Sequence, residues 1–299
     1  MWPSRASTVE AMETALSEIT LVLFTTLGPA GAVAYGLMAL PLIAKGQGME
    51  PTARVRLDRF LCIPIVVAMV GLVASATHLG NPANALYVIT GFGRSPLSNE
   101  VICGVVFLGA AGVFWLTSFS DGKPRVALRR ILAAIVSVLG LVLTGAIALA
   151  YDAETILTWN SLFTPVTIWF GAFAGGALLA LCGFRFAGFF TEGHRLGFGY
   201  LILAMLAFIG ALIAYLLWNA LLPEMQNALT SAADLAPAFG PMIGLFGILG
   251  SAGLLLALKA VAWKGEAPLW MPVTAAGLML AGLFLMRFQF YLIHMTVGL

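Results

Sequence analysis

The sequence predicts an all-α integral membrane protein, a bundle of eight transmembrane helices with both chain ends on the outer side of the membrane. Three observations lead to this prediction. Of the 299 residues, 61% are hydrophobic and only 9% are charged, whereas a soluble domain carries about 25% charged residues. Apolar runs long enough to cross a bilayer recur eight times along the chain. Basic residues gather in alternate connections between those runs.

Each helix is predicted from a stretch of about 20 mostly apolar residues, the length that the hydrocarbon core requires. The runs are apolar on all sides, which does not fit the alternating strands of a membrane barrel. Because they cover most of the chain, we expect residues 1–299 to form a single transmembrane anchor domain. The eight predicted spans are Ile19–Ala44, Arg59–Leu79, Glu100–Phe119, Val126–Tyr151, Leu162–Phe186, Leu196–Leu221, Ala238–Ala262 and Pro268–His294.

Composition also excludes several classes of protein. A net charge of +2 is too small to indicate a nucleic-acid partner. The N-terminal segment does not predict a secretory signal, because acidic residues follow Arg5 where a signal has an apolar core. No cysteine pair has CxxC spacing, so neither a disulfide framework nor a cysteine-bound metal cluster is expected; the three cysteines are Cys62, Cys103 and Cys182.

The orientation follows from the Lys and Arg residues of the short connections. Only Arg5 and Arg94 lie on the side of the two termini, which is predicted to be the outer, periplasmic side of a Gram-negative inner membrane. The odd-numbered connections are predicted to be cytoplasmic. They hold twelve basic residues: Lys45, Arg54, Arg56, Arg59, Lys123, Arg125, Arg129, Arg130, Arg185, Arg195, Lys259 and Lys264.

A candidate proton acceptor lies where the second span ends. Gly80 followed by Pro82 is a helix-stop signal, so His78 is predicted in the last turn, near the outer surface. The helix end favours a charged imidazole and burial opposes it. His78 is therefore suited to exchange protons near neutral pH. The alternative is a histidine at the lipid headgroups that binds a carbonyl.

A carboxylate begins the third span. Ser98 or Asn99 is predicted to cap this helix, which places Glu100 in its first turn, where the helix dipole favours negative charge. Acidic residues are common at helix starts. A function is suggested because Glu100 is expected to lie at the same depth as His78, on a neighbouring helix.

The last span carries further polar residues. At about 100° per residue, Arg287, Tyr291 and His294 fall on one face, with Arg287 about 10 Å deeper than His294. A charge at that depth should face the bundle interior and have a partner. Glu100 is the first candidate and Asp152 the second, and the alternative is that Arg287 snorkels to the surface.

The fourth connection, which lies on the outer side, is rich in aromatic and acidic residues. Tyr151 and Trp159 fit an aromatic belt at the membrane surface. Five residues of this side are candidates for a surface that docks a partner protein: Arg94, Asp152, Glu154, Trp159 and Asn160.

Three functional classes fit one polar cluster at one face of a membrane bundle. The first is a quinone-handling anchor for a redox enzyme. The second is a haem-binding electron carrier, for which only His78 and His294 could serve as a ligand pair, because His194 lies on the opposite side. The third is a transporter, which usually has polar or broken helices at the midplane, whereas these spans are apolar in their middles.

Several motifs carry a resemblance to a known family. They are His78-Leu79-Gly80-Asn81-Pro82, Leu97-Ser98-Asn99-Glu100, Thr158-Trp159, Thr164-Pro165, Gly175-Gly176, Phe290-Tyr291 and His294-Met295-Thr296-Val297-Gly298. Together with the eight spans, they resemble the membrane-anchor subunits of bacterial dimethyl sulfoxide reductases. The arrangement is more distantly similar to the anchors of polysulfide-reductase type enzymes.

The resemblance implies a complex with a molybdopterin catalytic subunit and an iron–sulfur subunit. The anchor, with no haem and no iron–sulfur cluster of its own, would oxidise menaquinol and pass electrons to the iron–sulfur subunit, which is expected on the periplasmic face. The implied quinol-binding residues are His78, Gly80 and Glu100. Asn84 and Leu86 stand where the family has a basic and an aromatic residue. This departure leaves open another sulfur compound, or quinone reduction in the reverse direction, as in sulfite oxidation.

Quinol oxidation fits these residue types, because it releases two protons and needs acceptors within hydrogen-bond reach. His78 is the predicted proton acceptor, and Glu100 is predicted either to relay the proton or to fix the quinol ring. Arg287, Tyr291 and His294 are predicted to shape or polarise the same cavity.

Overall fold

The computed structural model describes residues 5–45, 49–77, 88–119, 126–189, 194–228 and 230–296. These ranges are helical, and the β-structure within them consists of two isolated bridges. The helices are α1 (Arg5–Ser17), α2 (Ile19–Lys45), α3 (Pro51–Phe60), α4 (Cys62–Thr77), α6 (Pro96–Leu116), α7 (Val126–Ala150), α8 (Phe163–Phe186), α9 (His194–Leu221), α10 (Ala232–Leu235), α11 (Phe239–Val261) and α12 (Trp270–Leu292), with short 3-10 turns at Thr117–Phe119 and Leu222–Glu224.

The prediction of eight membrane-spanning helices is confirmed: eight stretches of the described chain are long and apolar enough to cross a bilayer. Six of the predicted spans agree with the observed helices to within two residues at each end. Tyr151 and His294 are therefore placed just beyond the ends of α7 and α12.

The predicted start of the second span is wrong. The span begins at Pro51 and continues through a turn at Leu61 to Thr77, so it includes all of α3. Pro51 suits a first helical position, and the Glu50 carboxylate caps the helix by accepting from the Ala53 amide at 2.8 Å. Four charged residues in α3 lower its hydropathy, which is why the apolar run suggested a later start.

The predicted start of the third span is also wrong. α6 begins at Pro96, and the residue that caps it is Ser95, whose hydroxyl accepts from the Ser98 amide at 3.4 Å. Asn99 lies inside the helix, and its side-chain oxygen accepts from the Gly93 amide at 2.7 Å. Glu100 therefore lies beyond the first turn, where the free amides of the helix start do not reach.

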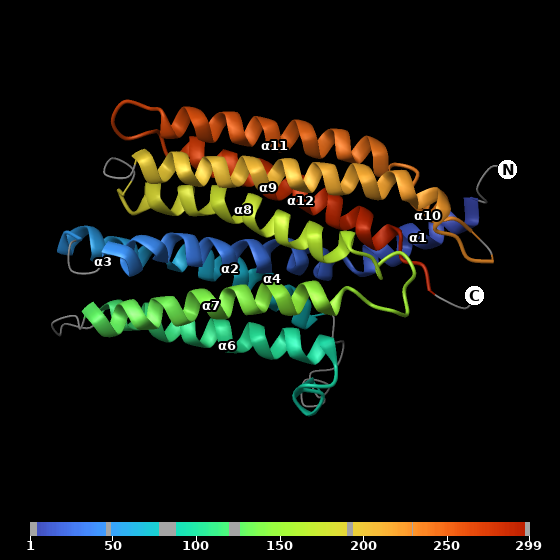
Figure 1. Cartoon of the computed structure of the whole chain (residues 1–299), viewed down its shortest axis with the longest axis horizontal. Helices are drawn as coiled ribbons and strands as arrows, with labels where there is room; N and C mark the ends of the chain where they lie inside the picture. Colours follow the sequence, from blue (N-terminus) through green and yellow to red (C-terminus); the bar gives the residue numbers. More distant parts are fainter. Residues whose placement is uncertain are drawn as a thin grey trace.

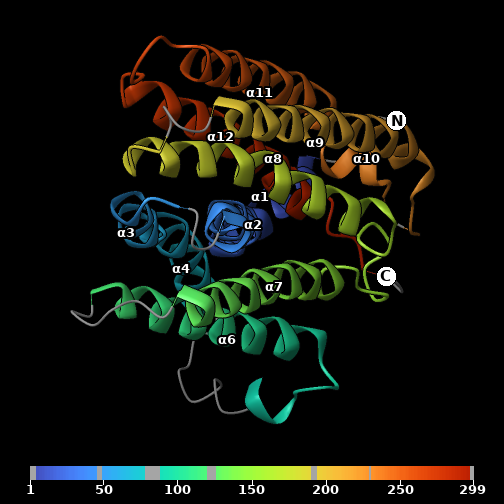
Figure 2. The same ribbon diagram turned by 60° about the vertical axis from the view of Figure 1, so that its left-hand side comes forward.

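The spans form two groups of four helices that meet at one seam. The first group is α2, α4, α6 and α7, and the second is α8, α9, α11 and α12. α2 lies at the centre and contacts α8 and α12 of the second group as well as α4 and α7 of its own. Figures 1 and 2 show this order from α6 and α7 at one edge to α9 and α11 at the other.

Small residues allow the close contact at the seam. A Cβ on Gly176 of α8 would lie 2.9 Å from the Ala30 carbonyl oxygen of α2, closer than a side chain is found to such an atom. In the bilayer, where lipid chains are as apolar as leucine, packing of this kind drives helix association. The seam therefore depends on the bare backbone at this position.

The two ends of the bundle differ in composition. α3 lies at one end, close to the start of α7, while α1, α10 and the end of α12 lie at the other (Figure 1).

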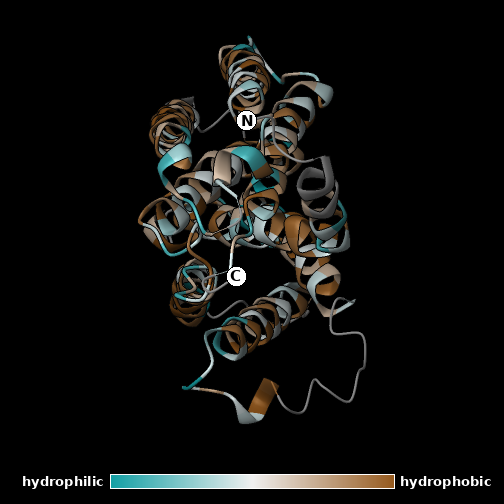
Figure 3. Ribbon diagram, turned by 90° about the vertical axis from the view of Figure 1, so that its right-hand side faces the viewer, coloured by the Kyte–Doolittle hydropathy of each residue, from teal (hydrophilic) through white to brown (hydrophobic). Residues whose placement is uncertain are grey.

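Large apolar side chains cover the outside of the bundle, among them Val113 (64% exposed) and Ile248 (67% exposed). Figure 3 shows brown, hydrophobic helices behind the more polar end that carries α1. An apolar exterior of this extent suits lipid and not water.

Candidate functional site

The structure brings several of the predicted site residues together at the end of the bundle that carries α1. Glu100 is 0% exposed, Tyr291 2% and Arg287 3%. His294 is half-buried. His78 and Gly80 lie outside the described residues, so their predicted roles stay predictions.

Glu100 is buried without a hydrogen-bond partner in the described part of the chain. Glu100 lies one turn before Gly104, on the face of α6 that also buries Phe107 and Ala111, and so points toward the interior. Neither carboxylate oxygen has a hydrogen-bond partner there. Buried carboxylates are almost always paired, so an unpaired one is a candidate for binding a ligand or a proton.

Arg287 faces the interior from α12, so snorkelling to the surface is excluded. Its Nη2 donates to the Thr167 hydroxyl of α8 at 3.2 Å, and its guanidinium lies 5.2 Å from the centre of the Phe290 ring. The predicted ion pair is wrong, because within the described ranges Arg287 bonds to neither Glu100 nor Asp152, and Nη1 has no partner. Arg287 therefore keeps a free donor inside the bundle.

Two tyrosines lie near both the carboxylate and the guanidinium. The rings of Tyr151 and Tyr291 meet edge to face, with centroids 6.0 Å apart. Glu100 and Arg287 both act electrostatically on the Tyr151 hydroxyl, which places all four polar groups in one neighbourhood. Neither tyrosine hydroxyl makes a hydrogen bond that meets strict geometry among the described residues.

We call Glu100, Tyr151, Arg287 and Tyr291 the buried polar cluster. It crosses the seam, because Glu100 and Tyr151 belong to the first group of helices and Arg287 and Tyr291 to the second. Sequence reasoning missed Tyr151 and the supporting Thr167 as members of this site. The spacing of Thr164 and Thr167 on α8, both buried, is a signal that could have indicated a polar stripe.

The predicted aromatic belt is wrong for both of its residues, because Tyr151 is 5% exposed and Trp159 8%. The Trp159 ring stacks on Phe290, and the connection that carries it is fastened to the C-terminal segment: the Leu157 amide donates to the Met295 carbonyl at 2.9 Å. The connection thus covers the cluster and does not anchor in headgroups.

His294 follows α12 and does not extend its helical face. Its ring meets Trp159 edge to face at 5.0 Å. Burial lowers the pKa of His294 below its ordinary value, and the carboxylate of Glu18 opposes the shift without cancelling it. His294 is therefore a neutral imidazole near pH 7, at the rim of the cluster.

Comparison with known proteins identifies the family. Residues 12–293 match the model of the DMSO reductase anchor subunit (DmsC). The chain belongs to the DMSO reductase anchor subunit family. It is a multi-pass membrane protein of the anchor-subunit type.

Relatives of known name cover nearly the whole of this anchor. It is 30% identical over 285 residues to the C subunit of anaerobic dimethyl sulfoxide reductase from Escherichia coli, covering 94% of this protein and 96% of that one. Identity is 27% to the anaerobic dimethyl sulfoxide reductase subunit YnfH of the same organism, with the same coverage. It is 26% over 297 residues to the C subunit of the Haemophilus influenzae enzyme, covering 96% and 99%.

Proposed function

We propose that this anchor subunit binds and oxidises menaquinol at the buried polar cluster and passes the electrons to an iron–sulfur subunit. The observation that carries the proposal is the set of unpartnered polar atoms that Glu100, Tyr151, Arg287 and Tyr291 bring to one buried place at the seam. Leaving a buried polar atom unsatisfied costs about 1–3 kcal/mol. A ligand with two hydroxyl groups on an apolar ring suits this combination.

The cluster contains the groups that the reaction needs. A quinol supplies two electrons and two protons when it is oxidised. The Glu100 carboxylate accepts a hydrogen bond and then a proton, which requires only that it lie within hydrogen-bond reach. Tyr151 and Tyr291 donate hydrogen bonds to the oxygens of the quinol ring. Arg287 lies on the second helix group and orients these oxygens through its free Nη1.

His78 is the proposed second proton acceptor, with Gly80 beside it. Both assignments come from the family resemblance of the motif. His294, neutral and at the rim, is proposed to shape the entrance to the cluster.

The electrons released by quinol oxidation pass to another polypeptide, because the anchor is expected to have no haem and no iron–sulfur cluster of its own. We place the iron–sulfur subunit, and the molybdopterin subunit that reduces dimethyl sulfoxide or a related substrate, at the end of the bundle that carries α1. Basic residues gather at the opposite end, which by the positive-inside rule is cytoplasmic. The docked end is then periplasmic, on a bacterial inner membrane.

The test is Glu100→Gln in the assembled complex, with Glu13→Gln as the matched control. Glu13 is an exposed carboxylate on α1 at the same end of the bundle. Removing the proton acceptor should slow menaquinol oxidation about 100-fold or more, while the complex still assembles and Glu13→Gln behaves as wild type. Full activity of Glu100→Gln would refute the assignment.

The remaining alternatives are separated by two measurements. Rates are compared with menaquinol as donor and dimethyl sulfoxide as acceptor, and with sulfite as donor and a quinone as acceptor; a faster second reaction reverses the proposed direction. A reduced-minus-oxidised optical spectrum of the purified protein tests the haem alternative, because a haem band would show a bound haem.

A further inference from the structure

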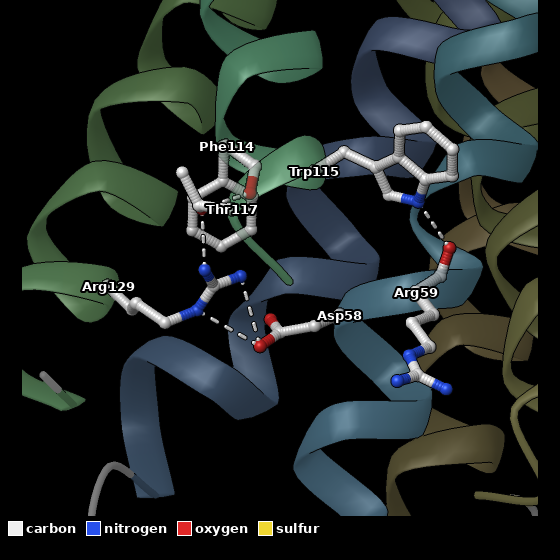
Figure 4. A network of polar contacts seen from close by, with 6 residues as sticks. All are labelled: Asp58, Arg59, Phe114, Trp115, Thr117 and Arg129. Carbon is white, nitrogen blue, oxygen red and sulfur yellow. Dashed lines mark hydrogen bonds and ion pairs between the residues drawn. The ribbon is translucent and has the colours of Figure 1, made fainter. Parts of the chain in front are cut away.

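A second polar site lies at the opposite end of the bundle, where α2, α3, α6 and α7 meet. Its centre is the ion pair of Arg129 and Asp58, joined by two contacts of 3.1 Å. Arg129 also donates to the Thr117 hydroxyl at 2.7 Å and lies 4.3 Å from the centre of the Phe114 ring. Figure 4 shows the guanidinium held between these groups. Arg129 is therefore held in place by Asp58, Thr117 and Phe114.

A partly open cavity of about 10 Å³ adjoins this ion pair. Its polar lining contains two arginines besides Arg129 and the single carboxylate of Asp58, and its apolar lining comes from three helices. The lining residues are Leu42, Arg54, Asp58, Phe114, Val126, Arg129 and Arg130. Three guanidinium groups face one carboxylate, so the cavity has an excess of positive charge.

Arg54 is the unusual member of this set. It is only 8% exposed, yet its guanidinium has neither a hydrogen bond nor an ion pair within the residues described. The nearby Asp58 carboxylate is already bound to Arg129. Arg54 lines the cavity and shares the electrostatic attraction of the Asp58 carboxylate with Arg129, so an anion in the cavity would give it a partner of its own.

Arg130 supplies a second guanidinium group to the cavity. Its Nε donates to the Ile43 carbonyl at 2.8 Å, which holds the side chain against the end of α2. Its two terminal nitrogens remain for a ligand, and Arg130 itself is exposed at the mouth of the cavity. Two guanidinium groups, one buried and one at the mouth, suit the oxygens of a phosphate.

The surroundings favour a phosphate carried by a lipid. The same helices expose large apolar side chains at this end of the bundle: Leu40 of α2 is 44% exposed, and Leu128 and Ile131 of α7 are 46% and 58% exposed. An acyl chain can lie on this surface while one phosphate oxygen enters the cavity, which has room for about one oxygen atom. Basic pockets at membrane surfaces recognise acidic lipids in this way.

We propose that Arg54 and Arg130 bind the phosphate of an anionic phospholipid at the basic end of the bundle, with the Asp58–Arg129 ion pair forming the wall of the site. The site is separate from the buried polar cluster and lies at the other end of the helices. Its occupant would brace α3 against α7 at the membrane surface.

The experiment measures lipid retention by the full-length protein purified with its complex and placed in nanodiscs of phosphatidylcholine with increasing phosphatidylglycerol. Native mass spectrometry counts the phosphatidylglycerol molecules that stay bound. Arg54→Gln and Arg130→Gln should each raise the phosphatidylglycerol fraction needed for half occupancy about tenfold or more, since each removes a charged hydrogen bond.

Arg56→Gln is the matched control. Arg56 lies on α3 two residues from Arg54, is exposed, and does not line the cavity; its replacement should leave retention unchanged. An equal loss in Arg56→Gln would overturn the proposal in favour of general surface charge. Displacement of the lipid by millimolar inorganic phosphate would overturn the lipid assignment, because the site would then take free phosphate.

Discussion

The indole of Trp159 lies flat on the ring of Phe290, with centroids 4.5 Å apart, and its N–H donates to the Phe290 carbonyl at 3.0 Å. Trp159 is in the connection after α7, and Phe290 is in the last turn of α12. This contact fastens the cover of the buried polar cluster to the helix that carries Arg287 and Tyr291.

Replacing Trp159 should loosen this cover. Trp159→Phe keeps a stacked ring and loses the hydrogen bond, which contributes about 0.5–1.5 kcal/mol. Trp159→Ala also loses the stacking and leaves a cavity, for a total of about 3–5 kcal/mol. Thermal unfolding of the purified complex measures the stability loss of each variant. Equal unfolding midpoints for Trp159→Phe and Trp159→Ala would show that the ring stacking does not hold the cover in place.

Thr167→Val tests the support of Arg287. The change removes the hydroxyl that Arg287 donates to and should raise the KM for menaquinol several-fold while kcat changes less. The control is Thr144→Val. Thr144 is also a buried helical threonine, but its hydroxyl donates to the Gly140 carbonyl of its own helix. A rise in KM that is the same in both variants would argue against a role for Arg287.

The two cluster tyrosines should be dispensable for stability and needed for binding. Tyr151→Phe and Tyr291→Phe remove hydroxyls that have no well-formed partner in the described structure, so the unfolding midpoint should stay or rise, and the KM for menaquinol should increase.

Tyr200→Phe provides the opposite case. The Tyr200 hydroxyl donates to the Leu37 carbonyl at 2.7 Å, away from the cluster. Its removal should cost about 1 kcal/mol of stability and leave the KM unchanged. A stability loss in the cluster variants with an unchanged KM would show that the hydroxyls are structural.

His294 should contribute to the pH dependence of stability. Because burial lowers its folded pKa below the unfolded value, the unfolded chain binds more protons in this range, and stability falls as the pH drops through about 6.5 toward the folded pKa. His294→Gln should flatten this part of the profile. Unfolding midpoints measured between pH 5 and pH 8 check it, and an unchanged slope would mean that other groups cause the dependence.

Most of the membrane architecture was predictable from local pattern. Eight apolar runs produced eight spans because a helix satisfies its own backbone in lipid, whatever its neighbours are. The pattern failed at α3, where charged residues lie within a helix, and at α6, where Pro96 and Ser95 start the helix one turn before the predicted cap.

The candidate site was only partly predictable. Arg287 was identified by its charge at membrane depth, which is costly enough to indicate function, and Tyr291 by the helical face it shares with Arg287. Glu100 was identified by the depth it was expected to share with His78 and by the family motif. The partner of Arg287 and the burial of Trp159 were not, because a hydroxyl acceptor on another helix and a connection folded over the bundle leave no periodic signal in the sequence.

The sequence by itself determined that the protein spans a membrane with eight helices and carries a carboxylate and a guanidinium within them, because burial in lipid depends on the hydropathy of each segment alone. Only the tertiary structure decided that Glu100 and Arg287 lie near the same two tyrosines across one seam, and that Arg54 is buried beside Asp58. These relationships depend on which helices pack together, and that is decided by contacts between residues far apart in the sequence.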